Sequence, residues 1–173
     1  QAVAVGKAEL ASAAARCRIV QRKLAGCIAS GTAARYRDLA RGETMRIEHI
    51  AYNVADPQKM AAWYAENLGF TIERAGGEPP FAHFLADETG GVMIEIYHNT
   101  ACAVPDYAQQ DPLMLHLALV SHDVEADVER LTGAGATVAD PVRTTPAGDT
   151  LCMLRDPWGF AVQLCQRAEP MVR

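Results

Sequence analysis

The sequence has little that would support a membrane-spanning, disulfide-bonded or nucleic-acid-binding protein. Its 173 residues include no run of about 18 apolar residues, so no transmembrane helix is predicted. The five cysteines are an odd number without CxxC spacing, which argues against a disulfide scaffold and a zinc knuckle and favours a reduced, cytoplasmic protein. Aromatic residues make up 6% and the net charge is −5, so few rings could stack on bases and phosphate would be repelled. We therefore expect neither a membrane nor a nucleic acid as a partner.

Charge divides the chain into two unequal parts. Residues 1–44 carry a net charge of +5, whereas residues 45–173 carry −10 and could attract cationic ligands. Residues 7–29 have the composition of a helix, but their arginines interrupt the apolar run that a secretory signal needs. We predict an N-terminal extension over 1–44, helical or disordered, with no assigned function. It could be an appended helix, translated sequence upstream of Met45, a transit peptide or a partner-binding helix.

The second part contains an internal repeat of two similar segments. Residues that match between the segments are 67 or 68 positions apart: His49 and His116, Ala51 and Ala118, Asp56 and Asp123, Gly91 and Gly159, Glu95 and Gln163. Solenoids have shorter periods and more copies. Two copies at this period instead indicate a duplicated module.

The sequence pattern of each copy predicts a strand, a helix and three further strands. The expected strands are 46–54, 70–74, 81–86 and 92–98 in the first copy, and 113–120, 136–140, 149–155 and 160–166 in the second. Asp56 and Asp123 stand where helix N-caps are expected, and Gly69 stands where the first helix should end. The pattern predicts an α+β fold over 45–173, made of two βαβββ modules at 45–99 and 112–167.

Strand alternation directs one polar side chain from each of four strands away from the helices. In the strand that closes the first copy, Ile94 and Ile96 face the helix and Glu95 faces the opposite side. The four polar residues selected in this way are His49, Glu95, His116 and Gln163. Two imidazoles, a carboxylate and an amide oxygen can coordinate a divalent metal ion, and a carboxylate enclosed without compensation would be costly. The alternative is that these are solvated positions without a ligand.

These motifs resemble the vicinal oxygen chelate superfamily, which includes glyoxalase, methylmalonyl-CoA epimerase, extradiol dioxygenases and bleomycin-resistance proteins. The resemblance covers residues 45–167 and is carried by HIAYNVAD (49–56), GVMIEI (91–96), LHLAL (115–119) and DPWGFAVQL (156–164). It implies a U-shaped, cup-like mixed sheet with a metal inside, held by His49, Glu95, His116 and Gln163. It also implies a homodimer, and some members build the cup from modules of two chains. The last ligand position is usually Glu, so Gln163 departs from the family pattern.

The resemblance implies a divalent-metal-dependent lyase or isomerase of the glyoxalase type, acting on a small carbonyl compound. A metal (Ni, Co, Zn, Mn or Fe) would stabilise an enediolate. Glu95 is the carboxylate among the four polar residues and is therefore the expected catalytic base. One alternative is a non-enzymatic protein that sequesters a small molecule, as bleomycin-resistance proteins do. Another is a ring-cleaving dioxygenase with His49, His116 and Glu95 as a facial triad. Metal content separates the lyase from the sequestering protein.

Overall fold

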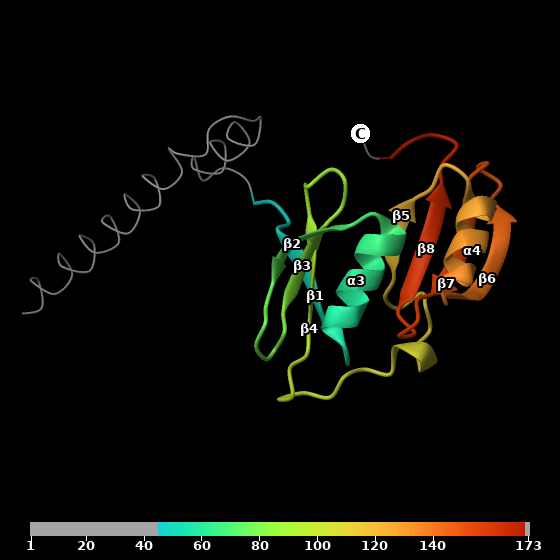
Figure 1. Cartoon of the computed structure of the whole chain (residues 1–173). Helices are drawn as coiled ribbons and strands as arrows, with labels where there is room; N and C mark the ends of the chain where they lie inside the picture. The colour runs from blue at the N-terminus through green and yellow to red at the C-terminus, as the bar shows by residue number, and fades with distance from the viewer. Residues whose placement is uncertain (1–44, 172–173) are drawn as a thin grey trace, which may run out of the picture. The chain divides into compact units, whose positions relative to one another are not determined.

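The computed structural model describes residues 45–171, and the extension predicted over 1–44 lies outside these residues. Residues 47–171, referred to below as the body, contain eight strands, two α-helices and a short 3₁₀ helix, η1 (Tyr107–Gln109). Figure 1 shows two groups of strands, each with its own helix, which confirms the α+β fold of two βαβββ modules. None of the helices among the described residues is long and apolar enough to cross a membrane.

The first module forms a four-stranded sheet, sheet A, covered by one helix. Its elements are β1 (His49–Asn53), α3 (Pro57–Leu68), β2 (Thr71–Ala75), β3 (His83–Ala86) and β4 (Met93–Tyr97). The strand order is β1-β4-β3-β2, with β1 parallel to β4 and the other pairs antiparallel. The helix begins where Asp56 Oδ1 accepts the Lys59 amide at 3.2 Å, and it ends at Gly69, whose φ of +74° is left-handed. Both helix limits therefore follow the sequence prediction.

The second module repeats this arrangement as sheet B. Its elements are β5 (Leu117–Val120), α4 (Val124–Gly133), β6 (Thr137–Thr144), β7 (Thr150–Arg155) and β8 (Ala161–Gln166), in the order β5-β8-β7-β6. The first strand is shorter than expected because residues 112–114 form a turn, in which Asp111 Oδ1 accepts the Leu113 amide at 2.9 Å. His116 consequently lies just before β5 rather than inside it.

The two modules pack against each other through α3. One apolar cluster joins Met60 and Tyr64 of this helix to Ile96 of sheet A and Phe160 of the second module. A second cluster lies beneath α4, and Trp63 of α3 contacts both clusters. Hydrogen bonds reinforce the junction, because the Trp63 indole donates to the Ala134 carbonyl at 2.9 Å. The helix-covered faces of both sheets thus form the core, and their opposite faces are left for a site.

A buried carboxylate lies at this junction, in the turn between β7 and β8. Asp156 is 4% exposed, and it accepts the Tyr64 hydroxyl at 2.8 Å and the amides of Trp158 and Phe160 at 2.9 Å each. Gly159 closes the turn with φ +84°, and a Cβ there would stand 2.9 Å from the backbone nitrogen of Ala108, so only glycine fits. Burial raises the pKa of Asp156 from 3.8 to about 6, despite these hydrogen bonds.

The raised pKa of Asp156 predicts a pH-dependent contribution to stability. A carboxyl with a higher pKa in the folded state than in the unfolded state favours folding below pH 3.8, and this advantage is lost as the pH rises through about 6. The full change is about 3 kcal/mol. Urea unfolding between pH 4.5 and 7.5 should therefore show the stability of wild type falling relative to Asp156→Asn, which cannot ionise. Parallel pH profiles for the two proteins would contradict this assignment.

Candidate functional site

The face of sheet A away from α3 carries a row of side chains that strand pairing brings into line. Glu95 of β4 pairs with Ala51 of β1 on one side and with Phe84 of β3 on the other. Residues paired across neighbouring strands project from the same face, and His49 joins them because it lies two residues before Ala51. The row therefore gathers His49, Glu95 and Phe84 on one surface.

His49 and Glu95 approach each other as two groups that can share a cation. The Nε2 atom of His49 lies 3.4 Å from Oε2 of Glu95, and their side chains are 33% and 20% exposed. Nδ1 of His49 donates its hydrogen to the carboxylate of Glu48, and Nε2 of the same ring faces Glu95. Nε2 and the Glu95 carboxylate form a favourable contact when either a proton or a metal ion lies between them. This arrangement fits a metal ligand pair in which a second carboxylate orients the histidine.

The second module holds the two corresponding residues, His116 just before β5 and Gln163 on β8. His116 donates from Nδ1 to the Pro112 carbonyl at 3.0 Å, which leaves Nε2 with its lone pair. Gln163 of β8 pairs with Ala118 of β5, and its Oε1 accepts the Cys165 thiol at 3.3 Å while keeping a second lone pair. Both side chains are partly buried. Their donor atoms therefore also fit a metal ligand set.

One chain does not bring these four predicted ligands into one cluster. Across residues 45–171, no group of three or more His, Cys, Asp or Glu side chains is placed to hold a metal ion. His49 and Glu95 meet on sheet A, whereas Gln163 lies on sheet B and His116 lies just before its strand β5, and the two sheets are separately hydrogen-bonded. Each module thus presents half of the expected ligand set.

Two other residues of types that could bind a metal or act as a nucleophile, His83 and Cys165, are buried. His83 is 6% exposed and its Nδ1 donates to the Phe81 carbonyl at 2.6 Å, so it is a hydrogen-bonded core histidine. Cys165 is buried, and burial raises the pKa of its thiol, which disfavours the nucleophilic thiolate. Neither residue is available for the chemistry of the site.

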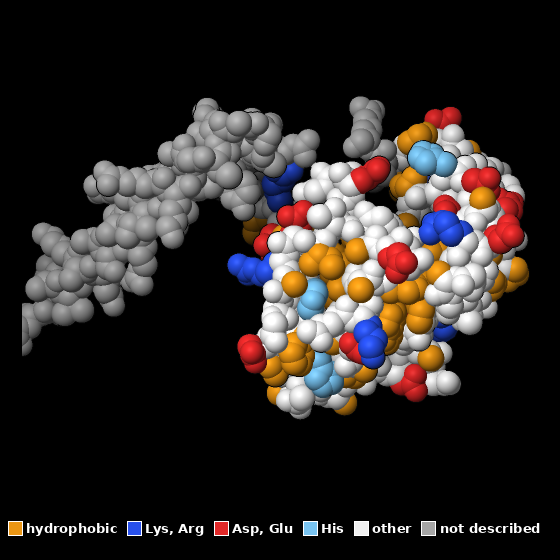
Figure 2. Space-filling model, in the orientation of Figure 1, with side chains coloured by type: hydrophobic (Ala, Val, Ile, Leu, Met, Phe, Trp, Pro, Cys, Tyr) orange, Lys and Arg blue, Asp and Glu red, His pale blue; other side chains and the backbone are white. Residues whose placement is uncertain are grey.

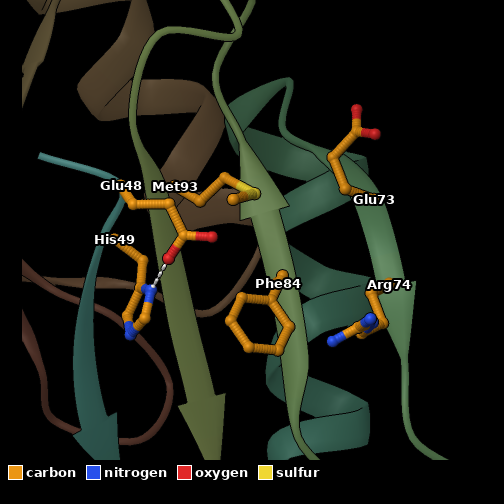
Figure 3. A pocket seen from close by; sticks show the side chains of 6 residues that line it. All are labelled: Glu48, His49, Glu73, Arg74, Phe84 and Met93. Carbon is orange, nitrogen blue, oxygen red and sulfur yellow. Dashed lines mark hydrogen bonds and ion pairs between the residues drawn. The ribbon is translucent and has the colours of Figure 1, made fainter. Parts of the chain in front are cut away.

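A concavity of about 340 Å³ is lined by His49, whose Nε2 contacts Glu95. Figure 3 shows Phe84 between the ring of His49 and the guanidinium of Arg74, with Met93 beside Glu48. The rings of His49 and Phe84 meet edge to face, with centroids 5.5 Å apart. Sequence reasoning missed Phe84 and Arg74, because their roles depend on contacts between neighbouring strands. It also missed Glu48, because strict alternation would place this side chain on the face opposite His49. The concavity gives the ligand pair an apolar floor and room for a small molecule.

The chain matches the model of the family described as "Glyoxalase/Bleomycin resistance protein/Dioxygenase superfamily" over residues 46–164. It belongs to this superfamily. A lactoylglutathione lyase of Salmonella typhimurium is 26% identical over 128 residues, which are 70% of this chain and 93% of that protein. Membership of the superfamily agrees with the two-module fold and with the resemblance read from the motifs.

Solved structures of superfamily proteins support the same fold. Glyoxalase I from Zea mays aligns with a TM-score of 0.60 and 22% identity, covering 76% of this chain and 48% of that chain. TnmS3, an antibiotic binding protein from Streptomyces sp. CB03234, aligns with a TM-score of 0.58 and 23% identity, covering 73% of this chain and 98% of that chain. A similar fold thus occurs both in a glyoxalase I and in an antibiotic binding protein.

Proposed function

We propose that this superfamily member is a divalent-metal-dependent lyase or isomerase of the glyoxalase type, acting on a small carbonyl compound. The observation that supports it most is the His49–Glu95 pair, in which a ring nitrogen and a carboxylate oxygen of the types that bind metal ions lie 3.4 Å apart, and His49 lines a concavity. The lactoylglutathione lyases among its relatives favour this chemistry over ring cleavage. Gln163 also counts against a standard dioxygenase, because it replaces the carboxylate usually found at that position.

We further propose that the complete metal site needs two copies of the chain. His49 and Glu95 of one copy would join His116 and Gln163 of the other, and a two-fold axis would create two such sites. The strands β1 and β5 are sheet edges, and exposed apolar residues lie on or beside them: Ile47, Ile50, Leu115 and Val120. An edge strand with exposed apolar side chains favours pairing with another chain. The homodimer would therefore cover these edges while it completes the ligand set.

In this proposal the bound metal supplies Lewis-acid stabilisation of negative charge on substrate oxygen. Glu95 removes the proton next to the carbonyl and returns it to the neighbouring carbon, because Gln163 has no basic atom to do so. The Glu48 carboxylate and the Pro112 carbonyl accept the Nδ1–H groups of the two histidines, which orients the rings and makes Nε2 the nitrogen that would hold the metal. Phe84 and Met93 supply the apolar part of the concavity, against which the carbon chain of a substrate would pack.

Metal analysis of untreated protein tests this proposal. We expect about one Ni, Co, Zn, Mn or Fe ion per chain and isomerase activity on hemithioacetals of small 2-oxoaldehydes. Chelation should abolish the activity, because the residues of both modules would lose the metal ion that they share. Readdition of the metal should restore the activity. A parallel screen with acyl-CoA thioesters and catechols would reveal an epimerase or an oxygen-consuming enzyme.

The sequestering protein is the second candidate, and the charge of the chain favours it. Acidic side chains are spread over the face of the body visible in Figure 2, and residues 45–173 carry a net charge of −10. Such a surface attracts cationic ligands without a metal. Protein that contains no stoichiometric metal, shows no turnover and binds a cationic drug would contradict the lyase proposal and support sequestration.

A further inference from the structure

A β-bulge directs Arg74 onto the face of sheet A that carries His49 and Glu95. The pairing of β2 with β3 shifts between Ile72 and Arg74, so that Arg74 stands opposite Phe84. In a regular strand Glu73 would take this place and Arg74 would face α3, because successive side chains alternate between the two faces. Bulges are over-represented next to active sites, where they re-aim a side chain.

The second module contains the same bulge but aims a different residue. The pairing of β6 with β7 shifts between Val138 and Asp140, which places Asp140 opposite Met153. Asp140 forms an ion pair with Arg143, since its Oδ2 lies 3.3 Å from Nε of that arginine. The bulge therefore belongs to the repeated module, and the side chain that it directs toward the site differs between the copies.

Arg74 is an unpaired cation in an acidic body. Of the six Lys and Arg side chains within residues 47–171, four form ion pairs with Asp side chains: Lys59, Arg130, Arg143 and Arg167. Arg155 donates to the carbonyls of Tyr107, Gln110 and Gly159. Arg74 has no such acceptor among the described residues, and its Cζ lies 5.7 Å from the centre of the Phe84 ring. The exposed guanidinium lies within cation–π range of Phe84, and its donors are free.

The carboxylates that share the concavity do not neutralise Arg74. Glu48 bonds His49, and Figure 3 shows Glu73 projecting away from the guanidinium and from Phe84. Phe84 separates two polar ends, because its centroid lies 5.5 Å from that of His49 and 5.7 Å from the Arg74 carbon. A free, forked donor group in this position is the complement of a carboxylate.

We propose that Arg74 binds a carboxylate of the ligand, which makes a small carboxylic acid the substrate class of this site. This inference rests on the proposed function, which assigns the metal-binding end of the ligand to His49 and Glu95. The ligand presents oxygen donors toward His49 and Glu95, its carboxylate accepts two hydrogen bonds from Arg74, and a short apolar segment lies against Phe84. The concavity of about 340 Å³ is near the lower end of the usual ~300–1,000 Å³ for small-molecule sites.

Two hydroxamates, which chelate metal ions with two oxygens, test the proposal by isothermal titration calorimetry. The full chain, loaded with Zn²⁺, is titrated with 4-carboxybenzohydroxamate and with benzohydroxamate. We expect the carboxylated probe to bind about tenfold more tightly, because a charge-assisted bidentate pair forms at Arg74. Arg74→Gln should abolish this preference without changing the affinity for benzohydroxamate. Arg74→Lys should keep part of it, and Arg143→Gln, which alters an exposed arginine in the second module, should keep all of it.

The titrations distinguish an error in the role proposed for Arg74 from an error in the proposed metal site. Equal affinity of wild-type protein for the two hydroxamates overturns the role of Arg74. If neither probe binds, the proposed metal site fails, and a second titration without added metal decides the role of Arg74. There benzoate should shift the Nε–H resonance of Arg74, assigned by its loss in Arg74→Gln, and benzamide should not. An unmoved resonance overturns the inference.

Discussion

Replacing Glu95 with glutamine is expected to lower turnover by about 10²–10⁴-fold, the usual contribution of a positioned general base. The amide has nearly the same size and still offers an oxygen, so substrate binding should survive and most of the bound metal should be retained. The neighbouring Glu48 cannot take over the proton transfer while its carboxylate holds Nδ1 of His49. Measurements of kcat, substrate affinity and metal content on the same preparations separate loss of the base from loss of the site.

Two further variants sharpen the test of Glu95. Glu66→Gln removes an exposed carboxylate from α3 and should leave turnover unchanged. The double variant Glu95→Gln with Gln163→Glu moves the carboxylate to the equivalent position of the second module. This exchange should recover part of the lost turnover if both positions border the same reacting atoms. Wild-type turnover in Glu95→Gln alone would remove Glu95 as the base.

Much of the fold could be predicted because its signals are local. The cap at Asp56 and the left-handed Gly69 limit α3 through contacts within a few residues. Alternation along β4 also predicted the facing of its side chains correctly, because Ile94 and Ile96 are buried while Glu95 faces the other side. These features depend on neighbours in sequence, and the sequence contains those neighbours.

The remaining features depend on contacts that periodicity does not describe. The bulge before Arg74 inverts the facing that strict alternation predicts for this side chain. The carboxylate of Asp156 is buried because Tyr64, 92 residues earlier, reaches it from α3. The separation of the ligand pairs arises because α3 packs against Phe160 of the second module, so that the helix lies between the two modules. Matching halves in a sequence indicate equivalent positions but not whether they meet within one chain.

The second large effect is expected in dimers that combine two different variant chains. Each variant alone should lose activity, and the mixed dimer should recover it. His49→Ala and His116→Ala should each lose at least about 100-fold in activity, together with most of the metal, because each damages every shared site. A heterodimer that pairs one chain of each variant contains one site with both histidines and one site with neither. Purified through two different affinity tags, it should show about half the wild-type activity and one metal ion per dimer.

The mirrored heterodimer is the control for this measurement. A chain that carries both substitutions, paired with a wild-type chain, has one damaged half in each shared site and should be inactive. Sites built within single chains would reverse the two results, because the wild-type chain would then keep an intact site. Activity and metal content of the two heterodimers test the shared site most directly. The account predicts an active first heterodimer and an inactive second one, and the opposite pattern, or two inactive heterodimers, would contradict it.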